Sequence, residues 1–377
     1  MARQLKPRVL FVSRERIRLP LTGAQRRKWD SIASVVDHRV LAAAPAGAPA
    51  GDATFRLVPP ARPAVLDGVF FYLGLPLRVA RELRRGRPDA AVVQGVHEAA
   101  AFLFARRLAG SRAPVILDVQ GDWHETTRLY GSPLRRLLNP ISDALPRFVV
   151  PRVDAVKTVS TQTTGLVRAL GVEPAAVFPA YVDAEAFLDR APEPLPSAPR
   201  AVFVGVLERT KAVDTLVDAW RLAAPQAPGA VLHLVGDGTL RGRVEALLAD
   251  LPEQTEWSRR LDPDQVARAM DDAWLVCLPS RSEGLPRVAL EAACRGRAIV
   301  GGDRGGIPDV VHDGENGLLV DPDDAGGLAR ALVRILGERA EAERMGAAAR
   351  RTGEEWVVTP EQYGARIEAL VRGVLEG

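Results

Sequence analysis

The stretch Pro279-Ser-Arg-Ser-Glu283-Gly-Leu-Pro-Arg-Val-Ala-Leu-Glu291 carries the strongest signal in this chain. It follows a short apolar run, residues 274–278, that is typical of a buried strand. It leads into a helix expected to open at Pro286, where proline fits the first turn. The start of a helix presents unpaired N–H groups and a positive dipole, which favour phosphate binding. Glu283 and Glu291 add carboxylates that accept hydrogen bonds from hydroxyl groups. The stretch therefore predicts a site for a ligand with phosphates and hydroxyls, such as a nucleotide sugar.

Short apolar runs alternate with helical patterns along both halves of the chain. Such alternation predicts an α/β fold, with parallel sheets covered by helices on both faces. The expected strands are residues 8–13, 90–93, 115–119, 155–159, 201–205, 231–235, 274–278 and 298–301. The helical patterns in the first half include residues 26–36, 75–85 and 99–108.

A proline-rich segment, residues 190–200, interrupts this alternation and is typical of an extended linker. We therefore predict two Rossmann-like domains that face each other across a cleft, over residues 1–189 and 201–355. Ligands of such sheets bind beyond the carboxyl ends of the strands. Residues 356–377 contain the capping box Thr359-Pro-Glu-Gln362 and are expected to form a helix that packs back towards the N-terminal domain.

Length and composition favour a cytoplasmic two-domain protein. The chain has 377 residues, which is too long for one compact core. Its longest apolar segment, residues 68–77, is much shorter than the roughly 20 residues that a membrane span needs. Cys277 and Cys294 are expected to be buried thiols in a reducing compartment. The N-terminus shows no signal-peptide pattern.

The charge is distributed unevenly between the two halves. Residues 1–190 contain 28 Lys and Arg against 17 Asp and Glu, whereas the remainder contains 22 against 30. A basic half is typical of contact with an anionic surface or substrate, although it also follows from an arginine-rich composition. Basic and apolar residues adjoin at 69–78 and 132–138, which favours peripheral contact with the inner face of a membrane. The low aromatic content, 5%, argues against nucleic acid as a partner.

Several further motifs occur in a fixed order and together identify a family. In the second half they are Phe203-Val-Gly-Val-Leu207 followed by Lys211, Val235-Gly-Asp-Gly238, the stretch from Glu283 to Glu291, Gly305-Gly-Ile-Pro-Asp309 and Asp313-Gly-Glu-Asn-Gly317. In the first half they are Asp154–Ser160, Leu170–Val172 and Val182–Phe187. These motifs resemble those of the retaining family-4 glycosyltransferases, the glycosyl transferases group 1, which have the GT-B fold. The resemblance covers about residues 85–350 and is strongest after residue 200.

The resemblance implies a donor site in the C-terminal domain. Glu291 would accept hydrogen bonds from the donor ribose, and Glu283 would hold hydroxyl groups of the transferred sugar. Lys211 would neutralise the diphosphate leaving group. The backbone near the diphosphate would come from Gly205 in the first strand, Gly23 in the N-terminal domain, and Gly284, Leu285, Pro286 and Arg287. The implied reaction is hexosyl transfer with retention, from a nucleotide-diphosphate sugar to an acceptor hydroxyl, in the synthesis of surface polysaccharides or glycolipids.

Two positions depart from the family pattern. Val206 stands where an arginine usually follows the glycine, and Arg209 is the candidate to supply the missing charge. Gln120 stands where the family often has histidine. The candidate residues on the acceptor side are therefore His97, Gln120, Asp122 and His124, each of which also fits a purely structural role.

No cofactor and no metal ion are expected. Asp262-Pro-Asp264 and Asp321-Pro-Asp323 match an Asp-x-Asp pattern, but both fit turns and helix caps beside proline. Two alternatives remain open: a GT-B epimerase acting on a nucleotide sugar, and a non-catalytic nucleotide-sugar-binding protein. The sequence does not determine the donor base, the sugar, the linkage or the oligomeric state. It does not identify the acceptor either, and lipid-linked compounds are among the candidates.

Overall fold

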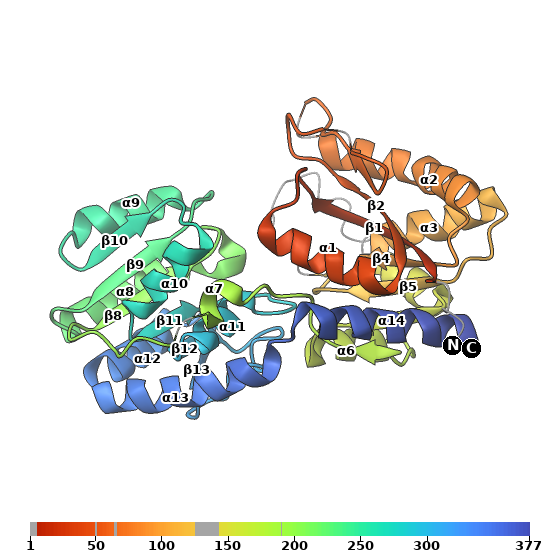
Figure 1. The fold of residues 1–377 in the computed structure, drawn as a ribbon. Coiled ribbons are helices and arrows are strands. Elements are labelled where there is room, and N and C mark those ends of the chain that lie inside the picture. Colours follow the sequence, from red (N-terminus) through yellow and green to blue (C-terminus); the bar gives the residue numbers. More distant parts are fainter. Residues whose placement is uncertain (1–5, 50, 64–65, 125–142, 190) are drawn as a thin grey trace.

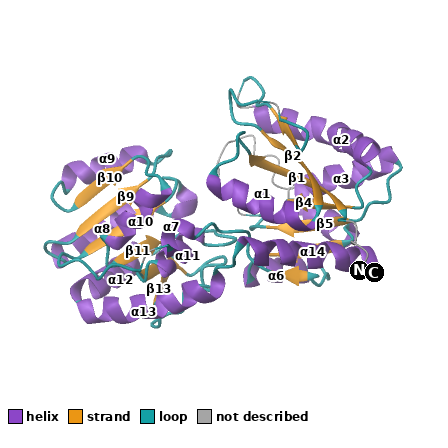
Figure 2. Ribbon diagram, viewed as in Figure 1, coloured by secondary structure: helices purple, strands orange, loops and turns teal. Residues whose placement is uncertain are grey.

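The computed structural model describes residues 6–49, 51–63, 66–124, 143–189 and 191–377. These residues form two lobes, each built around a parallel sheet with helices on both faces (Figures 1 and 2). This confirms the expected α/β fold. Of the two segments in which basic and apolar residues adjoin, 132–138 lies outside the described residues.

The N-terminal domain contains a seven-stranded sheet with the order β3-β2-β1-β4-β5-β6-β7, in which every pair is parallel. Its strands are β1 (Arg8–Arg16), β2 (Asp37–Ala43), β3 (Phe55–Val58), β4 (Ala90–Gln94), β5 (Val115–Val119), β6 (Ala155–Thr158) and β7 (Ala176–Val177). Its helices are α1 (Gly23–Val35), α2 (Asp67–Gly86), α3 (Val96–Ala109) and α6 (Thr161–Arg168), with a 3-10 turn at Val150–Arg152.

Helix α2 is longer than the pattern over residues 75–85 predicts. It begins at Asp67 and continues through Pro76 to Gly86. Asp67 in the first turn and Arg84 and Arg85 in the last complement the helix dipole. Proline costs the helix a hydrogen bond, but the buried side chains on either side of Pro76, Leu75 and Val79, keep both halves packed on the sheet.

The C-terminal domain contains a six-stranded parallel sheet with the order β10-β9-β8-β11-β12-β13. Its strands are β8 (Arg200–Val204), β9 (Val231–Val235), β10 (Thr255–Ser258), β11 (Leu275–Leu278), β12 (Ala298–Gly302) and β13 (Gly317–Val320). Its helices are α7 (Glu185–Leu188), α8 (Val213–Ala223), α9 (Arg241–Asp250), α10 (Pro263–Asp271), α11 (Arg287–Cys294), α12 (Ala325–Gly337) and α13 (Arg339–Trp356), with 3-10 turns at Arg209–Lys211 and Ala224–Gln226.

The crossing between the domains differs from the expected linker over residues 190–200. Val182 and Phe187 already pack in the core of the C-terminal domain. The proline-rich segment lies along that domain, because its backbone carbonyls accept hydrogen bonds from arginine side chains. Arg297 donates to the Glu193 carbonyl over 2.8 Å, and Arg339 donates to the Leu195 carbonyl over 2.7 Å. The segment is thus held as part of the second lobe.

The last helix, α14 (Pro360–Glu376), returns to the first lobe. It begins with the capping box of Thr359 and Gln362, and it packs against α1 (Figure 1). Tyr363 and Ile367 of α14 share an apolar cluster with Trp29 and Ile32 of α1. A second cluster fills the opposite face of the same sheet, beneath α2 and α3. The end of the chain is therefore part of the N-terminal domain.

The strand order reverses at matching places in the two sheets. It changes direction between β1 and β4 in the first sheet and between β8 and β11 in the second. Ligands of open α/β sheets bind beyond the carboxyl ends of the strands at such a reversal. The residues that follow β8 and β11, including Gly205 and the stretch from Pro279, lie at that position in the C-terminal domain.

Candidate active site

Lys211 and Glu283 form the central ion pair of the candidate site. The Lys211 Nζ lies 2.5 Å from the Glu283 Oε1, although the residues are 72 positions apart. The neighbouring strands β8 and β11 bring together the 3-10 turn that carries Lys211 and the loop that carries Glu283. The Ser280 hydroxyl donates a second hydrogen bond, over 2.9 Å, to the same carboxylate oxygen. A lysine ammonium has three N–H donors, so Lys211 can contact Glu283 and a phosphate together.

The turns after β8 and β9 pack backbone to backbone. The Gly205 N–H donates to the Val235 carbonyl over 2.9 Å. Gly236 follows with a φ of +146°, and a Cβ there would lie 1.8 Å from the Gly205 carbonyl oxygen. A side chain at position 236 would therefore force the two turns apart. Glycine at 236 keeps the loop that carries Lys211 close to the second strand.

The start of α11 offers fewer backbone donors than the sequence predicts. Of the residues 284–287, Arg287 donates its N–H to the Leu285 carbonyl over 2.9 Å, and Pro286 has no N–H. The N–H groups of Gly284 and Leu285 have no partner among the described residues. These two groups are the candidates for contact with a phosphate.

Glu291 lies one helical turn further along α11 and is partly buried. Its carboxylate forms no hydrogen bond and no ion pair with the described residues. Burial raises the pKa of Glu291 from 4.5 to about 7, and the charge of Arg287 offsets this rise only in part. A buried carboxylate without a partner is costly, so the side chain is suited to accept hydrogen bonds from a ligand.

Arg209 lies at the surface beside Asp214. Its side chain is 71% exposed, and its Nε lies 3.9 Å from the Asp214 carboxylate. Asp214 is also bound by the more buried Arg281, at 2.7 Å. Val206, which replaces the usual arginine, is 48% exposed. The ion pair of Arg209 among the described residues is thus with Asp214, and not with Glu283.

In the N-terminal domain, Gln120 belongs to a chain of hydrogen bonds. Its side-chain oxygen accepts from Gln94 over 2.8 Å, and its amide donates to Asp118 over 2.7 Å. Asp118 in turn accepts from the buried Lys157 over 2.9 Å. These contacts hold the Gln120 amide rigidly at the end of β5. The side chain can bind a ligand, but an amide cannot act as a base.

His97 lies beside a cavity of about 280 Å³ at the carboxyl ends of β4 and β5. Gln94, Glu98, Gln120, Asp122 and Trp123 also line this cavity. Burial lowers the pKa of His97, so its imidazole is neutral at pH 7. The Trp123 indole N–H is buried and has no hydrogen-bond partner among the described residues. This cavity is the candidate acceptor side of the site.

Glu98 is a buried carboxyl group of this cavity that the sequence did not reveal as a site residue. It accepts a hydrogen bond from the Tyr72 hydroxyl over 2.9 Å. Burial raises its pKa to about 7, against the lowering effect of the hydrogen bonds. Many helices have a glutamate in the first turn, so the sequence gives no reason to select Glu98. The contact with Tyr72, which only the folded domain forms, shows that Glu98 belongs to the cavity.

Asp122 and His124 are neighbours in space as well as in sequence. Asp122 accepts the His124 backbone N–H over 2.7 Å and the Gln162 side-chain amide over 3.3 Å. The His124 Nδ1 lies 2.7 Å from the Asp143 carboxylate.

Gly23 occupies the first position of α1, whose Arg27 pairs with Asp183 at 2.5 Å. Gly23 thus lies near the crossing between the domains.

The two halves of the site meet at a close backbone contact. A Cβ at Gly284 would lie 1.7 Å from the Gln120 carbonyl oxygen, and one at Gly306 would lie 2.3 Å from the Gly284 carbonyl oxygen. The Asp309 carboxylate also accepts the Thr161 backbone N–H, at the start of α6, over 2.6 Å. Glycine at 284 therefore allows the donor loop to touch the acceptor side. No pattern in the sequence pointed directly to these contacts.

Both Asp-x-Asp segments have structural roles. Asp262 caps α10 with Gln265, and Asp321 accepts the Asp323 backbone N–H over 3.0 Å. The described residues contain no group of three or more His, Cys, Asp or Glu side chains placed to hold a metal ion.

Among the described residues, no helix has both the length and the apolar character needed to cross a membrane.

Two family models match this chain. The model "Glycosyl transferases group 1" matches residues 187–352, and "Glycosyl transferase 4-like domain" matches residues 25–180. Together they cover most of both lobes. The first match contains Lys211, Glu283 and Glu291.

Among curated proteins, the chain is similar to a D-inositol 3-phosphate glycosyltransferase of Nocardia farcinica. The two are 34% identical over 178 residues, which are 44% of this chain and 39% of the relative. It is also similar to the sulfoquinovosyl transferase SQD2 of Arabidopsis thaliana, at 29% identity over 46% of this chain and 34% of the relative. The chain spans about half or less of the length of the curated relatives that it matches.

Solved structures share the whole fold. A sucrose-phosphate synthase from Thermosynechococcus elongatus superposes with a TM-score of 0.80 at 20% identity, over 98% of this chain and 100% of that one. Anabaena HepE in complex with UDP gives a TM-score of 0.69 at 16% identity, over 98% of this chain and 100% of that one. At such low identity these similarities establish the architecture alone.

Proposed function

Because the chain belongs to the glycosyl transferases group 1 family and has the GT-B fold, we propose that it is a retaining glycosyltransferase. It moves a hexose from a nucleotide-diphosphate sugar to an acceptor hydroxyl, in the synthesis of a surface polysaccharide or glycolipid. The observation that carries this proposal is the Lys211–Glu283 ion pair beside the start of α11, together with Glu291 on the same helix, which has no hydrogen-bond partner among the described residues.

Each of these groups fits one part of the donor. Glu291 accepts hydrogen bonds from the two ribose hydroxyls, because one carboxylate can accept both. The N–H groups of Gly284 and Leu285 hold the diphosphate at the helix start. Lys211 stabilises the negative charge that grows on the leaving phosphate, while Glu283 positions the sugar hydroxyls and the lysine.

Retention follows in this proposal from attack on the same face that the diphosphate leaves. The glycosidic C–O bond breaks, the diphosphate keeps its electron pair, and the acceptor oxygen forms the new bond. The acceptor proton passes to the leaving phosphate oxygen. The cavity beside His97, Glu98 and Trp123 holds the acceptor. The protein then contributes mainly positioning and electrostatic stabilisation, and no metal ion or other cofactor is required.

The donor class has support from proteins of the same fold. HepE was solved with UDP and UDP-glucose, and mycobacterial relatives are named as GDP-mannose-dependent mannosyltransferases. A thermal-shift screen with UDP-, GDP- and ADP-sugars identifies the donor, because a ligand stabilises the state that binds it. Lys211→Ala and Glu291→Ala are then tested for donor binding and for transfer.

We expect Lys211→Ala to lower turnover by about a hundredfold or more, as removal of a group that stabilises leaving-group charge does. Glu291→Ala should mainly weaken donor binding. Arg241→Ala and Glu245→Gln, a surface pair on α9 of the same domain, serve as matched controls. Unchanged binding and turnover in both site variants would refute the assignment.

A donor-binding protein without transferase activity is the second candidate. Val206 in place of the usual arginine and the fixed amide of Gln120 favour it. Donor binding that depends on Glu291, without transfer or hydrolysis in the presence of a broad set of acceptors, would support this alternative. An epimerase would instead isomerise the donor without any acceptor, which NMR of the nucleotide sugar detects.

We also propose that the N-terminal domain contacts the inner face of the cytoplasmic membrane. Its excess of basic residues and the adjoining apolar side chains of residues 69–78 support this contact. An acceptor that is lipid-linked would then reach the site from the membrane surface.

A further inference from the structure

Helix α2 exposes an apolar stripe to solvent. Leu73 is 71% exposed and Leu77 is 67% exposed, with Phe70 and Val69 also exposed earlier in the helix. At 100° per residue, these four side chains fall within a sector of about 100° of the helix surface. Burial of a leucine normally stabilises a protein by about 2 kcal/mol, so such a stripe left in water indicates an interaction surface.

The neighbouring helix extends this apolar surface. Phe104 and Leu108 of α3 are exposed, one turn apart. The two helices pack side by side, and Arg84 of α2 donates to the Leu108 carbonyl over 2.6 Å. Six of the eleven large apolar side chains that are exposed among the described residues lie on these two helices. The exposure is therefore concentrated on one face of the N-terminal domain.

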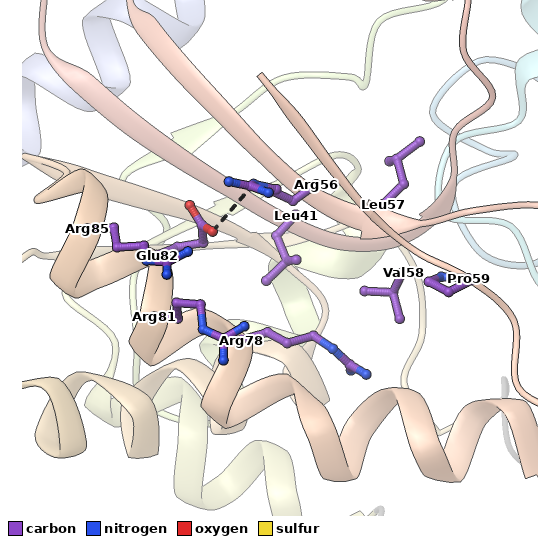
Figure 3. Close-up of a pocket in the computed structure, with 9 residues that line it drawn as sticks. All are labelled: Leu41, Arg56, Leu57, Val58, Pro59, Arg78, Arg81, Glu82 and Arg85. Atoms are coloured by element: carbon purple, nitrogen blue, oxygen red, sulfur yellow. Dashed lines mark ion pairs between the residues drawn. The ribbon is translucent and has the colours of Figure 1, made fainter. Parts of the chain in front are cut away.

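An arginine cradle adjoins this stripe, further along α2. Arg78, Arg81 and Arg85, together with Arg56 of β3, line a cavity of about 260 Å³. Figure 3 shows Arg78, Arg81 and Arg85 on the helix, opposite the strand segment of Arg56–Pro59. Arg78 is fixed by a hydrogen bond of 3.1 Å to the Phe71 carbonyl.

The cradle carries an excess of positive charge. None of Arg78, Arg81 and Arg85 forms an ion pair with the residues that the structure describes. Among those residues, the only carboxylate that lines the cavity is that of Glu82, which is buried. Its ion pairs go to Arg56 at 3.9 Å and to Arg39 at 3.5 Å, so it does not neutralise the other three arginines. Guanidinium groups placed along one side of a cavity can bind the oxygens of phosphate groups.

We propose that α2 is the docking surface for an anionic phospholipid bilayer. The side chains of Phe70, Leu73 and Leu77 enter the interfacial region, and anionic headgroups bind Arg78, Arg81 and Arg85 along the adjoining side of the helix. Free phosphate would fill the cradle but leave the apolar stripe in water, and a nucleic acid would do the same. A bilayer satisfies both features, since basic residues beside an apolar face are the pattern of interfacial helices.

The α2 surface is the part of the N-terminal domain that would make the membrane contact proposed above. How a lipid-linked acceptor would reach the site rests on the proposed function. Tyr72, between Phe70 and Leu73, donates to Glu98 in the cavity beside His97. The amino-terminal part of α2 thus reaches the candidate acceptor cavity. A lipid-linked acceptor could enter that cavity without leaving the membrane.

Co-sedimentation of the whole 377-residue chain with vesicles tests the proposal. One set contains phosphatidylcholine alone and the other also contains phosphatidylglycerol. We expect binding to the anionic vesicles only. Replacing Arg78, Arg81 and Arg85 together by Gln should weaken binding roughly a hundredfold, because each basic residue near an anionic surface contributes about fivefold. Leu73→Ser combined with Leu77→Ser should weaken it to a similar extent.

Matched controls lie on the other domain. Arg241, Arg259 and Arg330 replaced together by Gln change the net charge equally, and Leu222→Ser removes an exposed leucine of α8. Both should bind like the wild type. Inorganic phosphate should not release the protein more than chloride of equal ionic strength does. Equal binding to both vesicle types, no binding to either, competition by phosphate, or unchanged binding of the α2 variants would each overturn the proposal.

Donor binding separates this test from the proposed function. The α2 variants should show the same thermal stabilisation by the nucleotide sugar as the wild type, since α2 lies outside the donor site. That result also shows that they are folded. If membrane docking fails while donor binding and transfer persist, only the docking surface is refuted.

Discussion

At the scale of single residues, Glu291 has the most informative environment. Its carboxyl group is on the helix that the sequence predicts, but its lack of a partner among the described residues is a property of the folded domain. Burial raises its pKa to about 7, which means that in the unliganded protein about half of the Glu291 carboxyl groups hold a proton at pH 7, and most do below it.

This raised pKa predicts a pH-dependent donor affinity. Ribose hydroxyls donate to the ionised carboxylate, so below pH 7 donor binding must release the proton that Glu291 holds. Affinity should therefore fall by up to about tenfold for each pH unit below 7 and level off above it. Calorimetric titration of the donor between pH 5.5 and 8.5 measures this. Glu291→Gln should bind more weakly and lose the dependence; a variant that keeps the same profile would assign the titration to another group.

At the scale of elements, the contact between α1 and α14 determines how the chain end is held. A Cβ at Gly364 would lie 2.8 Å from the Ser31 carbonyl oxygen of α1. Glycine at this position lets the two helices approach closely over the cluster around Trp29 and Tyr363. Gly373, nine residues later in the same helix, faces open space, because a Cβ there would have no described atom within 4 Å.

The same substitution should therefore have opposite effects at these two positions. Gly364→Ala should destabilise the N-terminal domain by about 1–3 kcal/mol, because α14 has to move away from α1. Gly373→Ala should be neutral or stabilising by up to about 1 kcal/mol, since alanine favours the helix. Urea unfolding followed by circular dichroism measures both values. If the Gly364→Ala protein has the same free energy of unfolding as the wild type, α14 can move away from α1 at no cost, which would contradict this prediction.

At the scale of the whole molecule, the donor and acceptor sides meet through backbone contact. Gly284 of the donor loop touches Gln120, and Asp309 caps the start of α6 across the domain boundary. The donor groups Lys211, Glu283 and Glu291 all belong to one domain. Binding of the nucleotide and assembly of the complete site should therefore be separable.

Gly284→Ala should separate them. The added methyl group would collide with the Gln120 carbonyl, so the domains must open or shift. We expect transfer to fall by tenfold or more, as misplacement by about 1 Å can cost a hundredfold, while donor affinity changes little. Gly337→Ala, at a position where a Cβ would have no described atom within 4 Å, is the control. Small-angle scattering should show a more open Gly284→Ala protein. Equal losses of donor binding and transfer would indicate damage confined to the donor loop.

The sequence alone predicted the alternation of strands and helices and the main donor motif, because these features depend on neighbouring residues or on the order of motifs along the chain. Apolar periodicity predicted the alternating strands and helices, and proline and capping residues predicted the start of α14. The stretch from Glu283 to Glu291 pointed to a site for phosphates and hydroxyls, and the resemblance to the family added Lys211 to it. Only the tertiary structure decided which groups touch. Each of these contacts joins segments that are far apart in sequence, so its geometry depends on how the two sheets and the two domains pack. They are the Lys211–Glu283 pair, the chain of Gln94, Gln120, Asp118 and Lys157, the contact of the buried Glu98 with Tyr72, and the contact at Gly284. The same is true of the cradle on α2, since the periodicity places its arginines on a helix but β3 and the sheet beneath close the cavity around them.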